Sequence, residues 1–294
     1  MQDQADGLRR LAQKSQRTKK RRKTRTIVVT SGKGGVGKSS FSLNFALALK
    51  EQGFEVGILD ADLGLANLDL MMGVSAPFNI SHLISGKKTL KEILLKGPGG
   101  IYLIPGGSGI MSIALLDQAE LSVLLDSLTV LDEYLDFLIT DTGARISKQV
   151  LTFALAADEI MVVSTPDPTS LADAFGIIKI IDRGNPKSSI GIVVNQADNQ
   201  KHGALVFNRL DIVCKKFAGR DLNLIAIIPS DSTLSEAIRA QVPLMIYKNK
   251  CKGALAIKKA ALDYLKRNTL KTGRDSFEEG GLRGFIRKMV SMLK

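Results

Sequence analysis

The fold of this chain is decided by ten consecutive residues, Ser31-Gly32-Lys33-Gly34-Gly35-Val36-Gly37-Lys38-Ser39-Ser40. An apolar run precedes them at 27–29, and residues 41–49 follow with the apolar spacing of a helix. A strand, a glycine-rich loop and a helix N-terminus in this order form a phosphate cradle, because backbone N–H groups and the helix dipole both face the anion. Residues 32–39 fit the pattern G-x-x-x-x-G-K-[ST], in which Lys38 reaches the β- and γ-phosphates and the Ser39 hydroxyl binds Mg²⁺. We therefore expect residues 32–40 to bind the phosphates of a nucleotide.

A second lysine, Lys33, lies inside the same loop, although one triphosphate rarely needs two lysines from one loop. The form Lys-Gly-Gly-Val-Gly-Lys-Ser resembles the deviant Walker A loop of the MinD/ParA family of dimerising ATPases. In that family the early lysine crosses the dimer interface to the ATP of the partner. The resemblance therefore implies ATP and Mg²⁺ as ligands, a homodimer that forms with ATP, and catalytic roles for Lys33 and Lys38.

Charge is concentrated at the two ends of the 294-residue chain, whose formal net charge is +12. Residues 1–25 carry ten basic and two acidic side chains, and residues 266–294 carry eight and three, so the body between them is almost neutral. Cationic tails indicate anionic partners. Two distant cysteines, the absence of a long apolar segment and a basic N-terminus without an apolar stretch predict a cytoplasmic protein.

The body alternates short apolar runs with helical patterns. Such runs are typical of parallel strands buried on both faces, and the alternation predicts a doubly wound, mostly parallel α/β sheet with helices on both faces and ligands at the carboxyl ends of the strands. The expected strands are 26–31, 55–60, 101–105, 135–141, 159–164, 189–195 and 222–229, and the expected helices are 38–52, 117–131, 146–156, 169–182, 203–218, 232–240 and 252–267. We expect one ATPase domain over 26–267, after a basic arm at 1–25.

Three of the expected strands end in polar residues, which should meet at the edge that carries the phosphate loop. Asp60 and Asp62 follow the second strand, Asp141 ends the fourth and Asn195 ends the sixth. A single aspartate at a strand end is usually a turn or cap residue. Three polar ends beside one phosphate loop instead indicate a nucleotide site.

The resemblance assigns roles to these residues. Asp141 fits the Walker B carboxylate and Asp60 supports the metal, together with Ser39, while Asp62 orients the attacking water. The adenine would lie against Asn195 and against the segment Ile228-Pro229-Ser230-Asp231, in which Pro229 and Asp231 are the expected contacts. Arg145 stands where the family usually has glycine, a difference that bears on turnover more than on ATP binding.

The last fourteen residues predict an amphipathic helix. Its apolar side chains recur at i, i+3, i+4, i+7, i+8 and i+11, and they are Leu282, Phe285, Ile286, Met289, Val290 and Leu293. Basic residues lie on the opposite side. Such a helix can lie in the interface of an anionic membrane, and the polar linker 268–280 favours an independent module. The alternative is an ordinary helix that docks on the body. MinD-type proteins carry a similar element, which implies a peripheral location on the inner face of the cell membrane.

The N-terminus opens with Asp3, Gln4 and Ala5, which resemble the motif at the head of flagellar-number regulators of the FlhG type (also called FleN or YlxH). In those proteins the motif stimulates the GTPase of FlhF, a flagellar protein of the signal-recognition type. The resemblance implies a slow, dimer-dependent ATPase that controls the number and placement of flagella. It also leaves open a flagellar transcription activator or a switch-complex protein as a further partner.

Two alternatives remain at this stage. The basic arm could bind DNA nonspecifically, as in a ParA-type DNA-partitioning ATPase. Arg145 could instead make the protein an ATP-gated binding module with negligible turnover. Lipid binding would distinguish the membrane hypothesis from a DNA-partitioning ATPase. Phosphate release would distinguish an active ATPase from an ATP-gated binding module.

Overall fold

The computed structural model describes residues 23–62, 67–107, 124, 126–144, 146–271 and 281–293. The expected partner-binding residues at 3–5, and Arg145, lie outside these ranges. The side chain of Leu293 also lies outside the description.

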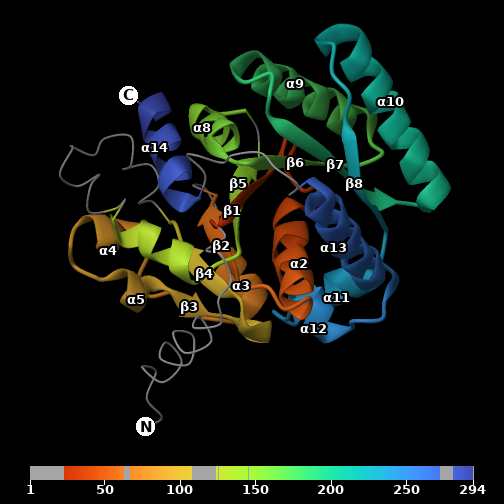
Figure 1. Ribbon diagram of the computed structural model, residues 1–294. Helices are drawn as coiled ribbons and strands as arrows, with labels where there is room; N and C mark the ends of the chain where they lie inside the picture. The colour runs from red at the N-terminus through yellow and green to blue at the C-terminus, as the bar shows by residue number, and fades with distance from the viewer. Residues whose placement is uncertain are drawn as a thin grey trace.

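An eight-stranded sheet crosses the described part of the chain, in the order β3-β4-β2-β5-β1-β6-β7-β8. All neighbouring strands pair in parallel except β3 and β4, which pair antiparallel at one edge. The strands are β1 Arg25–Ser31, β2 Val56–Ala61, β3 Leu95–Lys96, β4 Tyr102–Pro105, β5 Phe137–Ala144, β6 Glu159–Ser164, β7 Ser189–Ala197 and β8 Asn223–Pro229. The predicted doubly wound, mostly parallel α/β fold is therefore confirmed (Figure 1).

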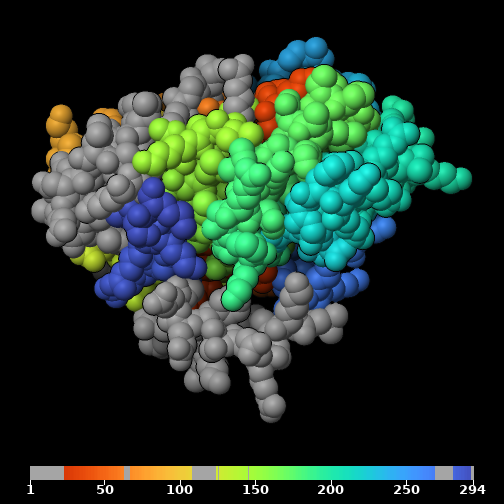
Figure 2. Space-filling model, turned by 90° about the horizontal axis from the view of Figure 1, so that it is seen from above, coloured from red at the N-terminus to blue at the C-terminus, as the bar shows by residue number. Residues whose placement is uncertain are grey.

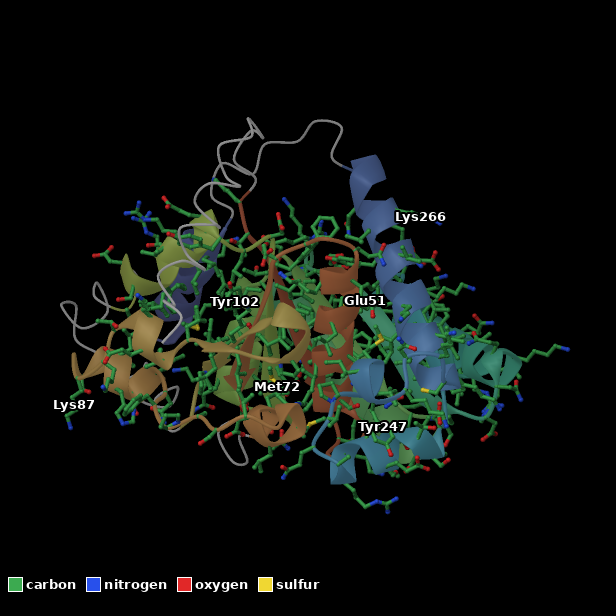
Figure 3. All side chains as sticks on the ribbon, turned by 90° about the horizontal axis from the view of Figure 1, so that it is seen from below. Glu51, Met72, Lys87, Tyr102, Tyr247 and Lys266 are labelled. Atoms are coloured by element: carbon green, nitrogen blue, oxygen red, sulfur yellow. The ribbon has the colours of Figure 1, made fainter. Side chains whose placement is uncertain are left out.

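Helices cover both faces of the sheet. The helices are α2 Lys38–Glu51, α3 Leu68–Met72, α4 Ile80–Ile84, α5 Leu90–Ile93, α8 Lys148–Ala156, α9 Pro168–Gly184, α10 Gln200–Ala218, α11 Ser232–Arg239, α12 Leu244–Tyr247, α13 Lys252–Lys271 and α14 Leu282–Leu293, with 3₁₀ turns η1 Pro98–Gly100 and η3 Val130–Glu133. One apolar core holds side chains of α2, α12 and α13, and the other holds side chains of α8, α9, α10 and α14. On the first face α2 and α13 lie side by side, with Glu51 and Lys266 on their outer surface (Figure 3).

Local sequence chemistry explains where the helices begin. The side chains of Ser147, Asp167, Asn199 and Asp231 each accept a hydrogen bond from a backbone N–H in the first turn of α8, α9, α10 and α11. Such caps satisfy N–H groups that have no partner within the helix. Because all four helices follow strands, the caps lie near the strand ends.

The predicted strands agree with the structure to within a few residues, and β6 agrees at both ends. The short antiparallel strand β3 was not expected. The predicted helix at 117–131 falls largely outside the described residues, although 124 and 126–129 are helical and η3 follows. None of the described helices is long and apolar enough to cross a membrane.

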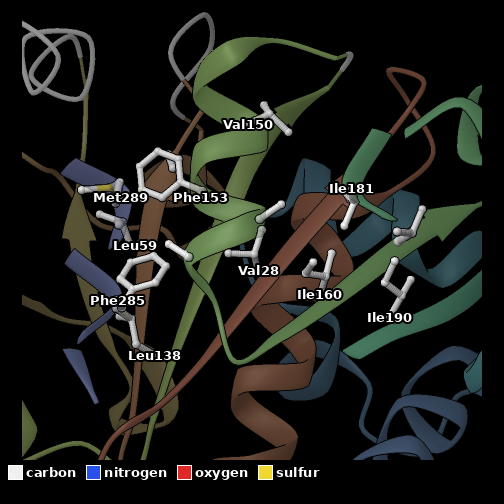
Figure 4. Close-up of a cluster of buried hydrophobic side chains, with 14 of the residues drawn as sticks. Val28, Leu59, Leu138, Val150, Phe153, Ile160, Ile181, Ile190, Phe285 and Met289 are labelled. Atoms are coloured by element: carbon white, nitrogen blue, oxygen red, sulfur yellow. The ribbon is translucent and has the colours of Figure 1, made fainter. Parts of the chain in front are cut away.

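The C-terminal helix α14 packs on the body rather than standing apart. Leu282, Phe285, Ile286, Met289 and Val290 are all buried in the same core as α8 and β1. Figure 4 shows Phe285 and Met289 beside Phe153 of α8, and the two phenylalanine ring centroids are 6.2 Å apart. From above, α14 lies against the neighbouring surface of α8 (Figure 2). The five described side chains of the apolar stripe, which was predicted to face a membrane, are thus covered by protein in this conformation.

Candidate nucleotide site

The phosphate loop lies between β1 and α2, as the sequence predicts. Gly35 and Gly37 have φ values of 77° and 85°, a region that side chains other than glycine adopt only with strain. A Cβ atom on Gly37 would lie 2.3 Å from the amide nitrogen of Asn195, and one on Gly32 would lie 2.4 Å from the backbone of Asp173. The glycines are therefore needed both for the turn and for close packing against the end of β7 and against α9.

A buried charged cluster lies where the loop enters α2. The Nζ atom of Lys38, whose side chain is only 6% exposed, is 3.2 Å from Oδ1 of Asp141 and 3.2 Å from Oγ of Ser39. Ser42 donates to the same Asp141 oxygen at 2.8 Å. The other carboxylate oxygen, Oδ2, is buried and has no hydrogen-bond partner among the described residues. Sequence reasoning missed Ser42, because a serine inside an apolar helical pattern carries no distinctive signal.

Asp60 lies directly beside Asp141, since the two residues pair across the parallel strands β2 and β5. Its carboxylate accepts weak hydrogen bonds from the backbone N–H groups of Asp62 and Leu68. Burial, and then the neighbouring charge of Asp141, raise the pKa of Asp60 to about 7. Asp62 lies next to the end of β5. A Cβ atom placed on Gly143 would be only 3.3 Å from Oδ1 of Asp62.

The donor set suits magnesium. Mg²⁺ prefers oxygen ligands, of which carboxylates are the usual protein source. Asp141 offers a buried oxygen without a partner among the described residues, Asp60 has its pKa raised by burial and then by the adjacent negative charge, and the Ser39 hydroxyl contacts the Lys38 amine of the same cluster. A divalent cation would satisfy the orphaned oxygen and offset the repulsion between the two carboxylates. The three residues predicted to hold the metal therefore fit it.

A cavity of about 190 Å³ adjoins the loop. It brings together the predicted loop residues Gly37 and Ser40 with Asn195, Pro229 and Asp231. Further lining side chains come from α2, α11, α12 and α13, and they are Phe41, Leu234, Leu244 and Ile257. Sequence reasoning missed these, because apolar side chains at helical spacing indicate a core. The mixture of apolar walls and a few polar groups is typical of a site for a base.

Two of the predicted base contacts have defined structural partners. Asn195 is 4% exposed and donates from Nδ2 to the carbonyl of Val36 at 2.7 Å, so it fixes the loop as well as lining the cavity. Asp231 accepts from the backbone N–H groups of Thr233 and Gly253, and thereby joins the starts of α11 and α13. Partial burial works to raise the pKa of Asp231, but these donors outweigh it and lower the pKa to about 2.

Lys33, another predicted site residue, lies apart from the buried charged cluster around Lys38. Its amine contacts Asp167 and Thr169 at the start of α9, each at 2.7 Å. The structure therefore brings together Lys38, Ser39, Asp60 and Asp141, and places Asp62 beside them.

The raised pKa of Asp60 predicts a pH-dependent stability. The native state holds this proton up to about pH 7, whereas the unfolded chain loses it near the ordinary aspartate pKa of 3.8. The contribution of Asp60 to the free energy of unfolding is thus fully present below pH 4 and is lost as the pH rises to 7. Asp60→Asn, which cannot ionise, should stabilise the nucleotide-free protein at pH 8 by on the order of 2 kcal/mol, within the ceiling of about 4 that three pKa units allow.

Urea denaturation at pH 5 and pH 8 tests this expectation. The gain from Asp60→Asn should be larger at pH 8. Asp69→Asn, a carboxylate in the first turn of α3, serves as the control. An equal effect of Asp60→Asn at both pH values would contradict the raised pKa.

Comparison with known proteins agrees with this geometry. A family model described as "ParA: NUBPL iron-transfer P-loop NTPase" matches residues 22–264. The antiactivator FleN of Pseudomonas aeruginosa is 35% identical over 235 residues, which cover 80% of this chain and 84% of that protein. The flagellum site-determining protein YlxH of Helicobacter pylori is 35% identical over 272 residues, covering 92% and 91%.

Among solved structures, MinD from Pyrococcus horikoshii, complexed with Mg-ADP, aligns with a TM-score of 0.66 at 24% identity, over 85% of this chain and all of that one. This likeness concerns the fold. Because the family model spans most of the chain and two relatives share about a third of its residues over most of its length, the protein belongs to the ParA/MinD family of P-loop NTPases.

Proposed function

We propose that this protein is a MinD-like ATPase that dimerises with ATP, binds the inner membrane through α14, and controls the number and placement of flagella. The observation that carries the ATPase part is the buried cluster of Lys38, Ser42 and Asp141 beneath a glycine-rich loop, with one carboxylate oxygen left without a partner. The flagellar part is supported by the resemblance to FleN and YlxH, whose names describe an antiactivator and a flagellum site-determining protein.

Each residue of the cluster has a definite task in this proposal. Lys38 would leave Asp141 for the phosphates of ATP, and Ser39, Asp60 and Asp141 would hold Mg²⁺. The bound metal would supply positive charge to the phosphate oxygens. Asp62 accepts a hydrogen bond from the attacking water and orients it toward the γ-phosphate. Lys33 of each subunit contacts the nucleotide of its partner.

Membrane binding requires α14 to leave its place on the body, since the same five apolar side chains cannot face lipid and the core beside α8 at once. A single short amphipathic helix binds a membrane weakly, and two helices in one dimer bind more tightly through their effective concentration. ATP-dependent dimerisation would thus favour the undocked state. Hydrolysis would return the protein to a monomer with a docked helix.

The N-terminal segment would act separately. Asp3, Gln4 and Ala5 are the proposed contact with the GTPase FlhF, on the strength of the resemblance alone. A flagellar transcription activator or a switch-complex protein is a further proposed partner.

Flotation of the full-length chain with anionic liposomes tests the proposal. We expect binding that needs ATP and Mg²⁺, that is lost in Lys38→Ala, and that is accompanied by phosphate release. Binding to DNA that survives deletion of residues 281–294, without lipid binding, would instead support a DNA-partitioning ATPase. Lipid binding without phosphate release would support an ATP-gated module.

The same liposome assay also tests whether α14 docks on the body. Asp132 of η3 caps the N-terminus of the docked helix. Its Oδ1 accepts from the backbone N–H of Leu282 at 2.9 Å. Loss of a helix cap costs about 0.5–2 kcal/mol, so Asp132→Ala should weaken docking and raise liposome binding without ATP by roughly two- to thirtyfold. Glu133→Ala removes the neighbouring, exposed carboxylate and is the matched control. Equal binding by the two variants would contradict the role of Asp132.

A further inference from the structure

The N-terminal arm is fixed to the body at its root, beside the helix that leads to the C-terminal tail. Thr24 donates from Oγ1 to the carbonyl of Leu135 at 2.9 Å. Arg25 donates to a carboxylate oxygen of Glu159, also at 2.9 Å, and its guanidinium lies 5.6 Å from the ring centroid of Tyr264 in α13. Because Arg25 and Glu159 begin β1 and β6, the arm leaves the body at the amino ends of the central strands.

The start of α14 lies against the same root. Gly281 precedes this helix with a φ of 92°, and a Cβ atom placed on it would be 3.2 Å from Cβ of Lys23 and 3.1 Å from both carboxylate oxygens of Asp132. That carboxylate also caps the helix at the backbone N–H of Leu282. A contact between opposite ends of the sequence thus places Lys23, the first described residue, beside the C-terminal helix.

Basic side chains are concentrated around this contact. Residues 19–23 are five consecutive basic residues, Lys-Lys-Arg-Arg-Lys. The exposed face of docked α14 is basic as well, and its charged side chains are Arg283, Arg287 and Lys288. Residues 19–22 lie outside the described ranges, but a chain spans at most about 3.5 Å per residue, so they stay within about 14 Å of the Cα atom of Lys23. The basic run of the arm and the basic face of α14 therefore lie on one side of the protein.

We propose that the basic run 19–23 binds anionic lipid headgroups beside α14, so that each subunit meets the membrane with two elements. The inference rests on the proposed function, in which α14 enters the membrane interface. Weak membrane anchors commonly act together with a polybasic patch. Each lysine or arginine near an anionic surface strengthens binding about fivefold, so the run supplies an attraction that the short helix lacks alone. Undocking does not separate the two elements, because α14 remains tethered to α13, against which Arg25 lies.

The placement favours lipid over nucleic acid as the partner of the run. A basic segment alone binds any polyanion through its charge. Here the segment is rooted beside a helix whose apolar stripe suits a membrane interface, so a surface that receives the start of α14 also comes within reach of the run. The basic face of α14 is exposed while its apolar face is buried. Charge therefore brings the docked protein to an anionic surface first, and release of α14 follows there.

Lys20→Gln/Arg21→Gln/Arg22→Gln tests the proposal in the full-length chain. With ATP and Mg²⁺, flotation with liposomes of phosphatidylcholine and phosphatidylserine should need at least about tenfold more lipid for half-binding than the wild type needs. The remaining binding should also depend less on salt, because fewer charges are screened. Dimerisation with a slowly hydrolysed ATP analogue, and phosphate release without lipid, should not change, since the whole of β1 separates the root of the arm from the phosphate loop.

Lys201→Gln/Arg209→Gln/Lys216→Gln is the matched control. It removes three exposed basic side chains from α10, which packs on β7 and β8 at the other end of the sheet from α14 (Figure 1). The control should bind liposomes as the wild type does.

Three outcomes would contradict the inference. An arm variant that binds lipid as tightly as the wild type, or a control that loses as much binding, would overturn it. Unchanged lipid binding together with a loss of DNA binding in the arm variant would assign the run to nucleic acid. A wild-type chain that binds no liposomes with ATP would contradict the proposed function itself, and this inference with it.

Discussion

Asp62→Ala should lower ATP hydrolysis by about two to four orders of magnitude, the usual contribution of a residue that orients or deprotonates the nucleophile. Asp62 lies beside the end of β5, and its proposed task is to orient water rather than to hold phosphate or metal. Its loss should therefore leave ATP binding intact. The ATP-bound dimer should then accumulate, which sedimentation with ATP and Mg²⁺ would detect together with phosphate release.

Two lysine variants should give the opposite result for dimerisation. Lys38→Ala removes the buried cation that faces Asp141 and would face the phosphates, and we expect neither hydrolysis nor dimer. Lys33→Ala should bind ATP but fail to dimerise. Asp69→Ala, a carboxylate in the first turn of α3, should behave like the wild type. Normal turnover in Asp62→Ala would show that another group orients the water, and a normal dimer in Lys33→Ala would remove the contact across the interface.

Much of the fold could be predicted because its signals are local. The strands β1 and β6 each contain an uninterrupted apolar run, at 27–29 and 160–163, and both strands are buried along almost their whole length. The phosphate loop requires positive φ angles at Gly35 and Gly37, where the sequence supplies glycine. By contrast, β3 has two residues, too few to show a period of any kind.

The parts of the site that were missed depend on contacts between distant segments. Asp167, the ion-pair partner of Lys33, lies 134 residues further along the chain. Nothing in the sequence near Asp167 shows whether its carboxylate pairs with a distant lysine or only caps a helix. Phe41, Leu244 and Ile257 line the cavity although their spacing is that of ordinary core residues. The apolar stripe on α14 is a similar case. The sequence shows that this face is covered, but it does not show whether lipid or protein covers it.

Substitutions on the two faces of α14 can distinguish a membrane helix from a purely structural one. Phe285 is 3% exposed and packs near Phe153, so Phe285→Ala should lower the free energy of unfolding by about 3–5 kcal/mol. Arg287 and Lys288 are exposed on the other face. Reversing both charges, in Arg287→Glu/Lys288→Glu, should leave stability within about 0.5 kcal/mol of the wild type.

Liposome binding should respond differently to the same variants. Each basic residue near an anionic surface contributes about 1 kcal/mol, so the double reversal should weaken ATP-dependent binding by more than about thirtyfold. The same change should have little effect on neutral liposomes or on turnover without lipid. If α14 only completed the core, Phe285→Ala would lower the free energy of unfolding of the protein, yet the charge reversal would not change liposome binding. Because docking uses the apolar face and electrostatic attraction to anionic lipid uses the basic face, only a helix with both functions loses stability in Phe285→Ala and liposome binding in the charge reversal.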